Sequence, residues 1–304
     1  MQNIARVCEH IQGFGLHTGD VPGLKMPLVL CRTKAFTYYL KDTENNYWRI
    51  YEFIEGTRSV DILENDNQAY EAAKSFGAFQ YCLQNLPGDK LNETIPNFHN
   101  TFNRLAQFKE VVRLDPVKRV RFVETEINFI LKRELLAGRL IELAKLGDIP
   151  DRITHNDTKI NNVLLDPQSN EGICVIDLDT VMPGLALYDF GDMVRSACNS
   201  AAEDEVNLEL VNFRMSIFEA LVRGYLKGTQ GMLNKTERLH LSTAACVITF
   251  ENGMRFLTDY INGDRYFKIK RPNHNLDRAR NQFALLQSME LNINGMNQYV
   301  TKFI

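Results

Sequence analysis

The sequence predicts an α+β protein in which a small lobe of helix and antiparallel strands joins a larger, mostly helical lobe. Residues 27–55 are rich in β-branched and aromatic residues on either side of a polar turn at 42–46, which predicts a hairpin. From Asp66 onward, apolar residues recur with helical spacing. Residues 152–180 break that pattern with two short apolar strands whose ends carry Asn or Asp.

The small lobe is assigned to residues 1–56. Residues 1–12 predict a helix, and four glycines then interrupt its pattern: Gly13, Gly15, Gly19 and Gly23. The strands at 27–55 follow, and Gly56 ends the last of them.

The larger lobe is assigned to residues 57–304. Residues 66–86 carry a helical apolar stripe, and the pair Asp115-Pro116 is typical of the start of another helix, which we extend to about Leu146. The later helices are expected at 203–227, 236–261 and 276–291, and the second of these is apolar almost all round, so it should be central.

Composition excludes several classes of protein. The chain has 304 residues, 44% hydrophobic and 24% charged, so it can bury a sizeable core. A net charge of −3, with no Lys/Arg run longer than two, argues against bulk nucleic-acid binding. The N-terminus has no apolar signal core, and no apolar run is long enough for a membrane span. We therefore expect a soluble protein of the cytoplasm.

The six cysteines form no CxxC pair, and none stands beside a His at metal-ligand spacing. Most have apolar neighbours, as Cys174 does in Gly-Ile-Cys-Val-Ile. These patterns predict buried, reduced thiols.

The motif most indicative of chemistry is His155-x-Asp157-x-Lys159-x-x-Asn162, with Asp177 fifteen residues further on. Phosphoryl transfer needs a carboxylate to orient the acceptor hydroxyl and oxygen ligands for Mg²⁺ on the phosphates. Asp157 can be the base, and Lys159 can reach the transferred phosphoryl charge. Asn162 and Asp177 can be metal ligands. His155 opens the motif and completes the predicted catalytic set.

Hairpin geometry supports that assignment. If strands 162–166 and 172–177 pair across a tight turn, Asn162 and Asp177 meet at the open end. The alternative is an ordinary hairpin with polar ends. The motif, the hairpin and the apolar-flanked Asp occurring together favour the functional interpretation.

A second group of charged residues follows. Asp179 lies two residues after Asp177, so both share a face if the segment is a strand, and Asp179 is a further metal-ligand candidate. Asp189 and Asp192 precede an apolar segment, where they can cap a helix or support the catalytic loop. For Arg195 an ion pair is the favoured interpretation.

The chain resembles the aminoglycoside phosphotransferase-like kinase family in three segments: 155–162, 175–184 and 188–192. The stretches Ile-Asp-Leu-Asp-Thr-Val-Met-Pro and Phe-Gly-Asp-Met-Val-Arg are similar to the N-acetylhexosamine 1-kinase branch. The resemblance covers nearly the whole chain. It implies a protein-kinase-like bilobal fold with a truncated N-terminal lobe and a mostly helical C-terminal lobe.

The resemblance also implies ATP, Mg²⁺ and phosphorylation of the anomeric hydroxyl of an N-acetylhexosamine, with Asp157 as the base. The segment Tyr51-Glu52-Phe53 resembles the hinge whose backbone binds adenine. Arg255, followed by Tyr260, resembles an acceptor-side helix, although an ion pair on the helix surface is an equal alternative for Arg255. His99 is expected to be a peripheral structural residue.

One departure from the family is large, because no Gly-rich loop or strand Lys precedes the first helix. We interpret Gly13, Gly15 and Gly19 as a flexible loop rather than a phosphate cradle. We therefore expect a small lobe that lacks its first strands. The cause would be a gene start assigned too late, a shortened chain, or a natural form with weakened ATP binding. Weak activity and a homodimer through the exposed sheet edge would follow.

Two alternatives stay open. The first is a non-catalytic kinase-like protein that binds a sugar or a partner. The second is the same fold with another acceptor, such as an aminoglycoside, choline or homoserine. A cationic aminoglycoside should require an acidic pocket, and a neutral sugar suits Arg255 better.

Overall fold

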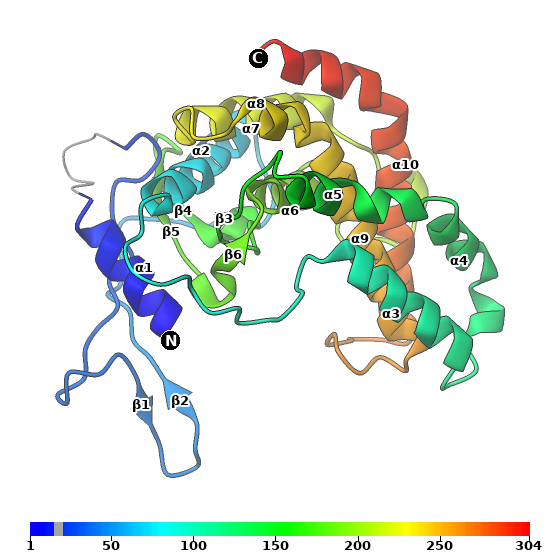
Figure 1. The fold of residues 1–304 in the computed structure, drawn as a ribbon, viewed down its shortest axis with the longest axis horizontal. Helices are drawn as coiled ribbons and strands as arrows, with labels where there is room; N and C mark the ends of the chain where they lie inside the picture. Colours follow the sequence, from blue (N-terminus) through cyan, green and yellow to red (C-terminus); the bar gives the residue numbers. More distant parts are fainter. Residues whose placement is uncertain (15–20) are drawn as a thin grey trace. The chain divides into compact units, whose positions relative to one another are not determined.

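The computed structural model describes residues 1–14 and 21–304 (Figure 1). Its contacts divide the chain into two compact units. The first unit contains residues 1–96, 151–189 and 220–234, and the second contains residues 97–150, 190–219 and 235–304. These two units do not correspond to the predicted small lobe (residues 1–56) and large lobe (residues 57–304). The lobe boundary at residue 56 therefore stays a prediction.

The first unit begins with α1 (Gln2–Gln12), which confirms the predicted helix. Its buried face includes Ile4, Val7 and Ile11, spaced as an amphipathic helix requires. Of the predicted glycine loop, Gly15 and Gly19 lie outside the described residues. Gly23 has φ +103°, and a Cβ there would lie 2.7 Å from the Lys74 carbonyl oxygen, so the position requires glycine.

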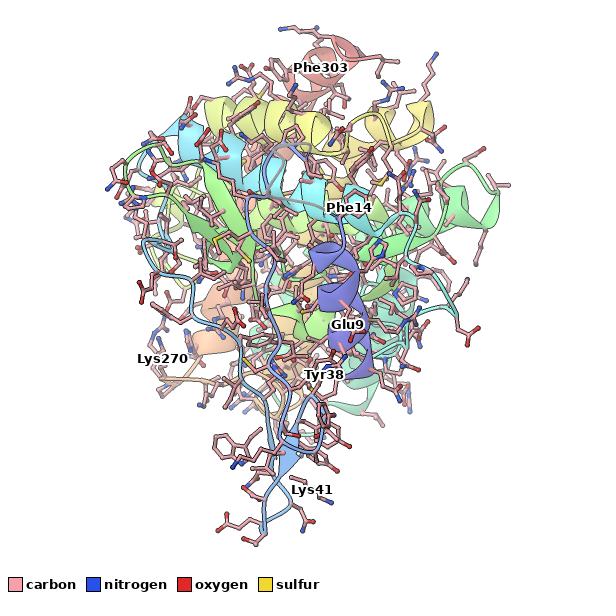
Figure 2. The ribbon with its side chains drawn as sticks, turned by 90° about the vertical axis from the view of Figure 1, so that its left-hand side faces the viewer. Glu9, Phe14, Tyr38, Lys41, Lys270 and Phe303 are labelled. Atoms are coloured by element: carbon pink, nitrogen blue, oxygen red, sulfur yellow. The ribbon has the colours of Figure 1, made fainter. Side chains whose placement is uncertain are left out.

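The predicted hairpin is present but short. Strands β1 (Leu40–Lys41) and β2 (Tyr47–Trp48) pair antiparallel around a turn in which the Asp42 carboxylate accepts from the backbone of Glu44 and Asn46. Beyond these two strands, the pairing found within residues 27–55 is an isolated bridge between Leu30 and Tyr51 and its neighbouring backbone bonds. The side chains of both short strands are exposed, and a two-stranded hairpin of this kind is marginally stable. Figure 2 shows Lys41 at this hairpin and Tyr38 beside Glu9 of α1.

Helix α2 (Asp66–Leu83) confirms the next prediction, and its N-cap Asn65 accepts from the backbone of Gln68. The predicted stripe is buried. Small residues let the backbone of α7 (Met215–Gly228) approach α2 closely, since a Cβ on Gly224 would lie 2.1 Å from the Tyr70 carbonyl oxygen.

Two short sheets complete the first unit. Strands β4 (Val163–Leu165) and β5 (Gly172–Val175) pair antiparallel with Val163 opposite Val175, which confirms the predicted hairpin. Strand β3 (Arg152–Thr154) pairs with β6 (Met182–Gly184). The 3₁₀ turns Ile160–Asn162 and Leu178–Thr180 lie between these strands, so most of the candidate catalytic residues stand where strands end.

The second unit is helical. It contains α3 (Thr101–Leu114), α4 (Glu124–Leu131), α5 (Arg139–Lys145), most of α6 (Ala186–Ala197), α8 (Lys235–Leu239), α9 (Leu241–Ile261) and α10 (His274–Thr301). Helix α9 is buried on nearly every face and packs against α3 and α10 (Figure 1), so the prediction that it is central is confirmed.

The single helix predicted from Asp115 to Leu146 is wrong. Helix α3 ends there instead, since Asp115 is left-handed with φ 41°. The Asp115 carboxylate accepts from the backbone of Arg119 and Val120, which stabilises a turn. Helices α4 and α5 and 3₁₀ turns at Val120–Phe122 and Glu134–Gly138 follow.

The helix predicted at 203–227 is also wrong in its first half. Helix α6 ends at Ala197, the 3₁₀ turn Leu208–Leu210 follows, and α7 begins only at Met215. Helix α10 is longer than predicted and reaches Thr301.

The thiol prediction is confirmed, because all six cysteines are free and five are buried. Burial raises the pKa of Cys8, Cys82 and Cys174 to about 12, so these thiols are poor nucleophiles. In the part of the chain that the structure describes, no helix is long and apolar enough to cross a membrane.

Candidate active site

The predicted catalytic loop is held by the carboxylate of Asp189, in the first turn of α6. Asp189 accepts from the backbone nitrogen of His155 at 2.9 Å and of Asn156 at 2.7 Å, and from the amide of Gln80. Asn156 has φ +65°, so these bonds secure a left-handed turn that lacks the usual glycine. The side chain of Asp189 fixes the backbone from which Asp157 projects.

Burial raises the pKa of Asp189, although the two backbone donors and Gln80 oppose that rise. Gln80 is itself buried, and Tyr225 donates to its carbonyl oxygen at 2.5 Å. The support of the loop therefore extends from α6 to α2 and α7.

His155 is fully buried and uses both ring nitrogens. Its Nε2 donates to the Ile176 carbonyl at 2.9 Å, and its Nδ1 accepts from the backbone of Asp157 at 3.3 Å. The edges of Phe76 and Phe79 pack against its ring. This geometry gives His155 a positioning role, because it ties the catalytic loop to the end of β5.

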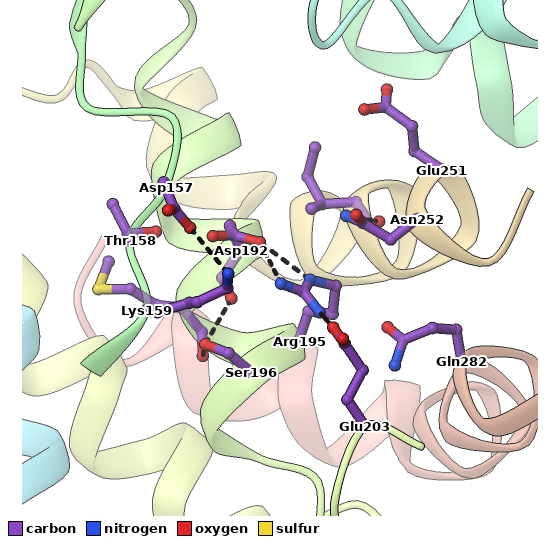
Figure 3. Close-up of polar contacts among 12 residues, drawn as sticks. Asp157, Thr158, Lys159, Asp192, Arg195, Ser196, Glu203, Glu251, Asn252 and Gln282 are labelled. Carbon is purple, nitrogen blue, oxygen red and sulfur yellow. Dashed lines mark hydrogen bonds and ion pairs between the residues drawn. The ribbon is translucent and has the colours of Figure 1, made fainter. Parts of the chain in front are cut away.

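Asp157 and Lys159 lie at the accessible side of the loop. Lys159 Nζ is 3.5 Å from Asp157 Oδ1 (Figure 3), and side-chain exposures of 48% and 30% leave both open to a ligand. A carboxylate beside an ammonium group can receive a proton while the ammonium group attracts a phosphoryl group.

Asn162 and Asp177 occupy the open end of the hairpin. The Asn162 amide nitrogen donates to the Asp157 carbonyl at 2.9 Å, and the Asn162 carbonyl accepts from Ile176, the neighbour of Asp177. The Asn162 side-chain oxygen thus stays available. Asp177 is exposed, is left-handed with φ 61°, and has no hydrogen-bond or ion-pair partner among the described residues. These oxygens suit a divalent cation.

Asp179 is differently placed. Its carboxylate forms an ion pair with Arg49 at 2.7 Å, and this contact raises the pKa of Arg49. As a metal ligand, Asp179 would share its charge with that guanidinium group. Within the described part of the chain, no three His, Cys, Asp or Glu side chains converge as a metal site. The predicted metal ligands Asn162, Asp177 and Asp179 are not a group of that kind, because Asn162 would contribute an amide oxygen.

The predicted hinge, residues 51–53, lies shortly after β2. Tyr51 pairs with Leu30 in an isolated bridge, and the backbone nitrogen of Glu52 donates to Val29 at 2.9 Å. Phe53 is 88% exposed, and its backbone makes no hydrogen bond with the described residues. Of the three residues, Phe53 offers the backbone groups that a planar base could bind.

In the second unit, Asp192 supports Arg195. The guanidinium group is buried, with bonds to Asp192 at 2.9 Å and to Glu203 at 2.8 Å (Figure 3), which confirms the predicted ion pair. Despite burial, the charges of Asp192 and Glu203 raise the pKa of Arg195.

His99 is structural, as predicted, but not peripheral. Its Nδ1 lies 2.8 Å from the carboxylate of Glu251, which is fully buried and also accepts from Thr101 at 2.5 Å. Burial alone would raise the pKa of Glu251, but His99, Arg255 and Thr101 outweigh it and hold that pKa below its ordinary value.

Arg255 lines a cavity of about 160 Å³ in the second unit. The other lining residues come from α3, α9 and the segment after α9: Arg104, Gln107, Thr258, Asp259, Asn262, Tyr266 and Phe267. Tyr260 does not line it, and its ring instead lies 4.5 Å from the guanidinium carbon of Arg119.

Arg104 and Tyr266 line the cavity although no sequence motif marks them. The available signal for this region was the basic run Arg265, Lys268, Lys270 and Arg271 after α9.

Comparison with known proteins gives one family. The profile of the phosphotransferase enzyme family matches residues 1–231. An aminoglycoside phosphotransferase from Alicyclobacillus acidocaldarius is structurally similar, with a TM-score of 0.59 and 14% identity over 98% of this chain and 84% of that one.

Two further solved structures are similar. A microcompartment-associated aminopropanol kinase gives a TM-score of 0.58 and 13% identity over 95% of this chain and 81% of that one. A choline/ethanolamine kinase family protein from Mesorhizobium loti gives a TM-score of 0.54 and 13% identity, over 98% of this chain and 83% of that one. At these identities the likeness concerns the fold, and the predicted protein-kinase-like fold class is confirmed.

Proposed function

Because the chain belongs to the phosphotransferase enzyme family, we propose that it transfers the γ-phosphoryl group of ATP to a hydroxyl group of a small molecule. The observation that carries the proposal is the geometry of Asp157. Its carboxylate is accessible and lies beside Lys159, on a loop whose backbone Asp189 holds from behind. A fixed loop with one accessible carboxylate is what in-line transfer to a hydroxyl group needs.

In the proposed reaction, the acceptor oxygen forms a bond to the γ-phosphorus while the bond from that phosphorus to the β–γ bridging oxygen breaks. Asp157 receives the hydroxyl proton, and ADP leaves with the bridging oxygen. Lys159 offsets charge on the transferred group. Asn162 and Asp177 would hold Mg²⁺, which when bound neutralises phosphate charge.

We propose an N-acetylhexosamine as the acceptor, phosphorylated at its anomeric hydroxyl. The support is the similarity of residues 176–183 and 190–195 to that branch, together with Arg255 on α9. Aminopropanol and choline, named for two similar structures, are cationic at neutral pH. Arg104 and Arg255 in one cavity disfavour such acceptors near Arg255.

The test is phosphoryl transfer from Mg-ATP to N-acetylglucosamine, N-acetylgalactosamine, choline and an aminoglycoside, followed by ³¹P NMR of the product. We expect a sugar 1-phosphate. Asp157→Asn should lower kcat by about 10²–10⁴-fold, the usual contribution of a general base. Asp151→Asn, an exposed carboxylate before β3, is the matched control. Sugar binding without turnover would support the non-catalytic alternative instead.

The partner prediction is kept as a proposal. The exposed side chains of Leu40, Tyr47 and Trp48 on the β1–β2 hairpin support a homodimer through that edge. Light scattering of wild type and of Trp48→Lys tests it, since the charge should favour the monomer. The cytoplasmic location also stays a prediction.

A further inference from the structure

Two arginines share one small cavity in the second unit, between α3 and α9. Arg104 and Arg255 both line it, and both are half-buried. Neither has a carboxylate within ion-pair distance among residues 1–14 and 21–304. Two half-buried positive charges without such partners make the cavity electropositive, which favours an anionic ligand.

The hydrogen bonds of these arginines leave donors to spare. Arg104 donates to the Phe98 carbonyl at 3.1 and 3.3 Å and to the Gln107 side chain at 3.4 Å, all uncharged acceptors. Arg255 donates to the Asn252 side chain at 3.5 Å, and its guanidinium group lies over the rings of Phe98 and Phe267. Since a guanidinium group has five N–H donors, most of those on Arg255 lack an acceptor within the described residues.

The acidic groups near the cavity are already engaged. Asp259 accepts from the backbone nitrogens of Arg265, Tyr266 and Phe267 and from Asn275. Glu251 pairs with His99. Burial lowers the pKa of Arg104, and the charge of Arg255 lowers it further despite the opposing effect of Glu251. The positive charges therefore repel each other inside the cavity.

The segment after α9 adds to the positive charge around the cavity. Residues 262–273 contain four basic side chains and one acidic one, Asp264, which pairs with Arg119. Arg265, Lys268 and Lys270 are exposed. A basic segment at the rim raises the local concentration of anions.

We propose that this cavity binds an anionic group, a phosphate or carboxylate of a small molecule, between the guanidinium groups of Arg104 and Arg255. Planar guanidinium groups bind such oxygens in pairs. The cavity, at about 160 Å³, is smaller than the roughly 300–1,000 Å³ of pockets for drug-sized ligands. It fits a small anion or one anionic substituent. The inference uses the second unit alone and does not depend on phosphoryl transfer.

Calorimetry with inorganic phosphate, on the full chain at low salt and without ATP, tests the proposal. We expect saturable binding that weakens with added sodium chloride. Arg104→Gln and Arg255→Gln should each weaken it at least tenfold, and Arg104→Lys should weaken it less. The matched control is Arg113→Gln, an arginine on the same helix that pairs with Glu110 outside the cavity; its affinity should equal that of wild type.

Two results would overturn the proposal: no saturable binding by wild type, or equal affinity in wild type and Arg255→Gln. Circular dichroism of each variant shows whether it is folded, and the retained charge in Arg104→Lys separates charge from packing. N-acetylglucosamine 6-phosphate and N-acetylglucosamine distinguish the source of the anion. Tighter binding of the sugar phosphate than of phosphate indicates a substituent of the acceptor, and equal binding indicates a free anion.

Discussion

The carboxylate of Asp189 lies 2.7 Å from the backbone nitrogen of Asn156, 33 residues earlier in the chain. This contact joins the first turn of α6 to a left-handed residue in the middle of the candidate catalytic loop. Asp189 thus acts on Asp157 through the backbone and needs no contact with substrate. Its protonation state then decides how firmly the loop is held.

The first prediction concerns Gln80→Leu. The Gln80 amide donates to Asp189 and lowers the pKa that burial raises, so its loss should raise that pKa further. The acid limb of the kcat profile should move to higher pH, because protonated Asp189 accepts the backbone donors less well. The exposed Gln84→Leu on the same stretch of chain is the control, and an unmoved acid limb would count against this role for Gln80.

The same variant has a predicted effect on stability. The folded-state pKa of Asp189 is raised. Its contribution to the free energy of unfolding is therefore fully present below the ordinary pKa of 3.8, and it is lost as the pH rises through the folded-state pKa. Gln80→Leu, which removes a donor from a buried carboxylate, should cost about 1–3 kcal/mol at neutral pH and less near pH 4. Urea denaturation at both pH values measures the difference.

A second prediction concerns Asp177→Asn. The amide keeps an oxygen but loses the charge that a hard divalent cation requires. The Mg²⁺ concentration for half-maximal activity, and the Mg²⁺ affinity measured by calorimetry with ADP, should both weaken more than tenfold. Asp166→Asn provides the control, since Asp166 only caps the turn of the same hairpin. Unchanged Mg²⁺ dependence in Asp177→Asn would remove Asp177 from the metal site.

A third prediction compares two arginines, each paired with an acid three residues earlier. Arg195 is buried between Asp192 and Glu203, whereas the pair of Arg113 and Glu110 is exposed. Arg195→Met should lower the free energy of unfolding by about 3–5 kcal/mol, because it removes the buried positive charge that bonds to both Asp192 and Glu203. Arg113→Met should leave the urea midpoint unchanged. Similar midpoints for the two variants would contradict this account.

Local patterns explain which features the sequence could predict. The hairpin at 162–177 forms between strands six residues apart, so turn residues and apolar runs were sufficient to place it. The break at Asp115 was not predictable from the pair Asp115-Pro116, because the Asp115 carboxylate stabilises a turn as readily as a helix start. Arg104 and Tyr266 meet across 162 residues, and no single segment carries that information.

The last prediction concerns two glycines inside helices. A Cβ on Gly224 of α7 would lie 2.1 Å from the Tyr70 carbonyl oxygen, whereas one on Gly295 of α10 would have only Met215 Cε, at 3.9 Å, within reach. Gly224→Ala should therefore destabilise the protein by about 1–3 kcal/mol, because the rigid backbone of α2 cannot yield. Gly295→Ala should stabilise it by about 0.5–1 kcal/mol through helix propensity alone.

Thermal and urea denaturation of the two variants should move in opposite directions from wild type. A loss of stability in both would show that α10 is held more tightly at Gly295 than its exposure indicates. No loss in Gly224→Ala would mean that α7 can move away from α2. In that case the Tyr225 hydroxyl, one residue further on, would not be fixed well enough to hold Gln80 against Asp189.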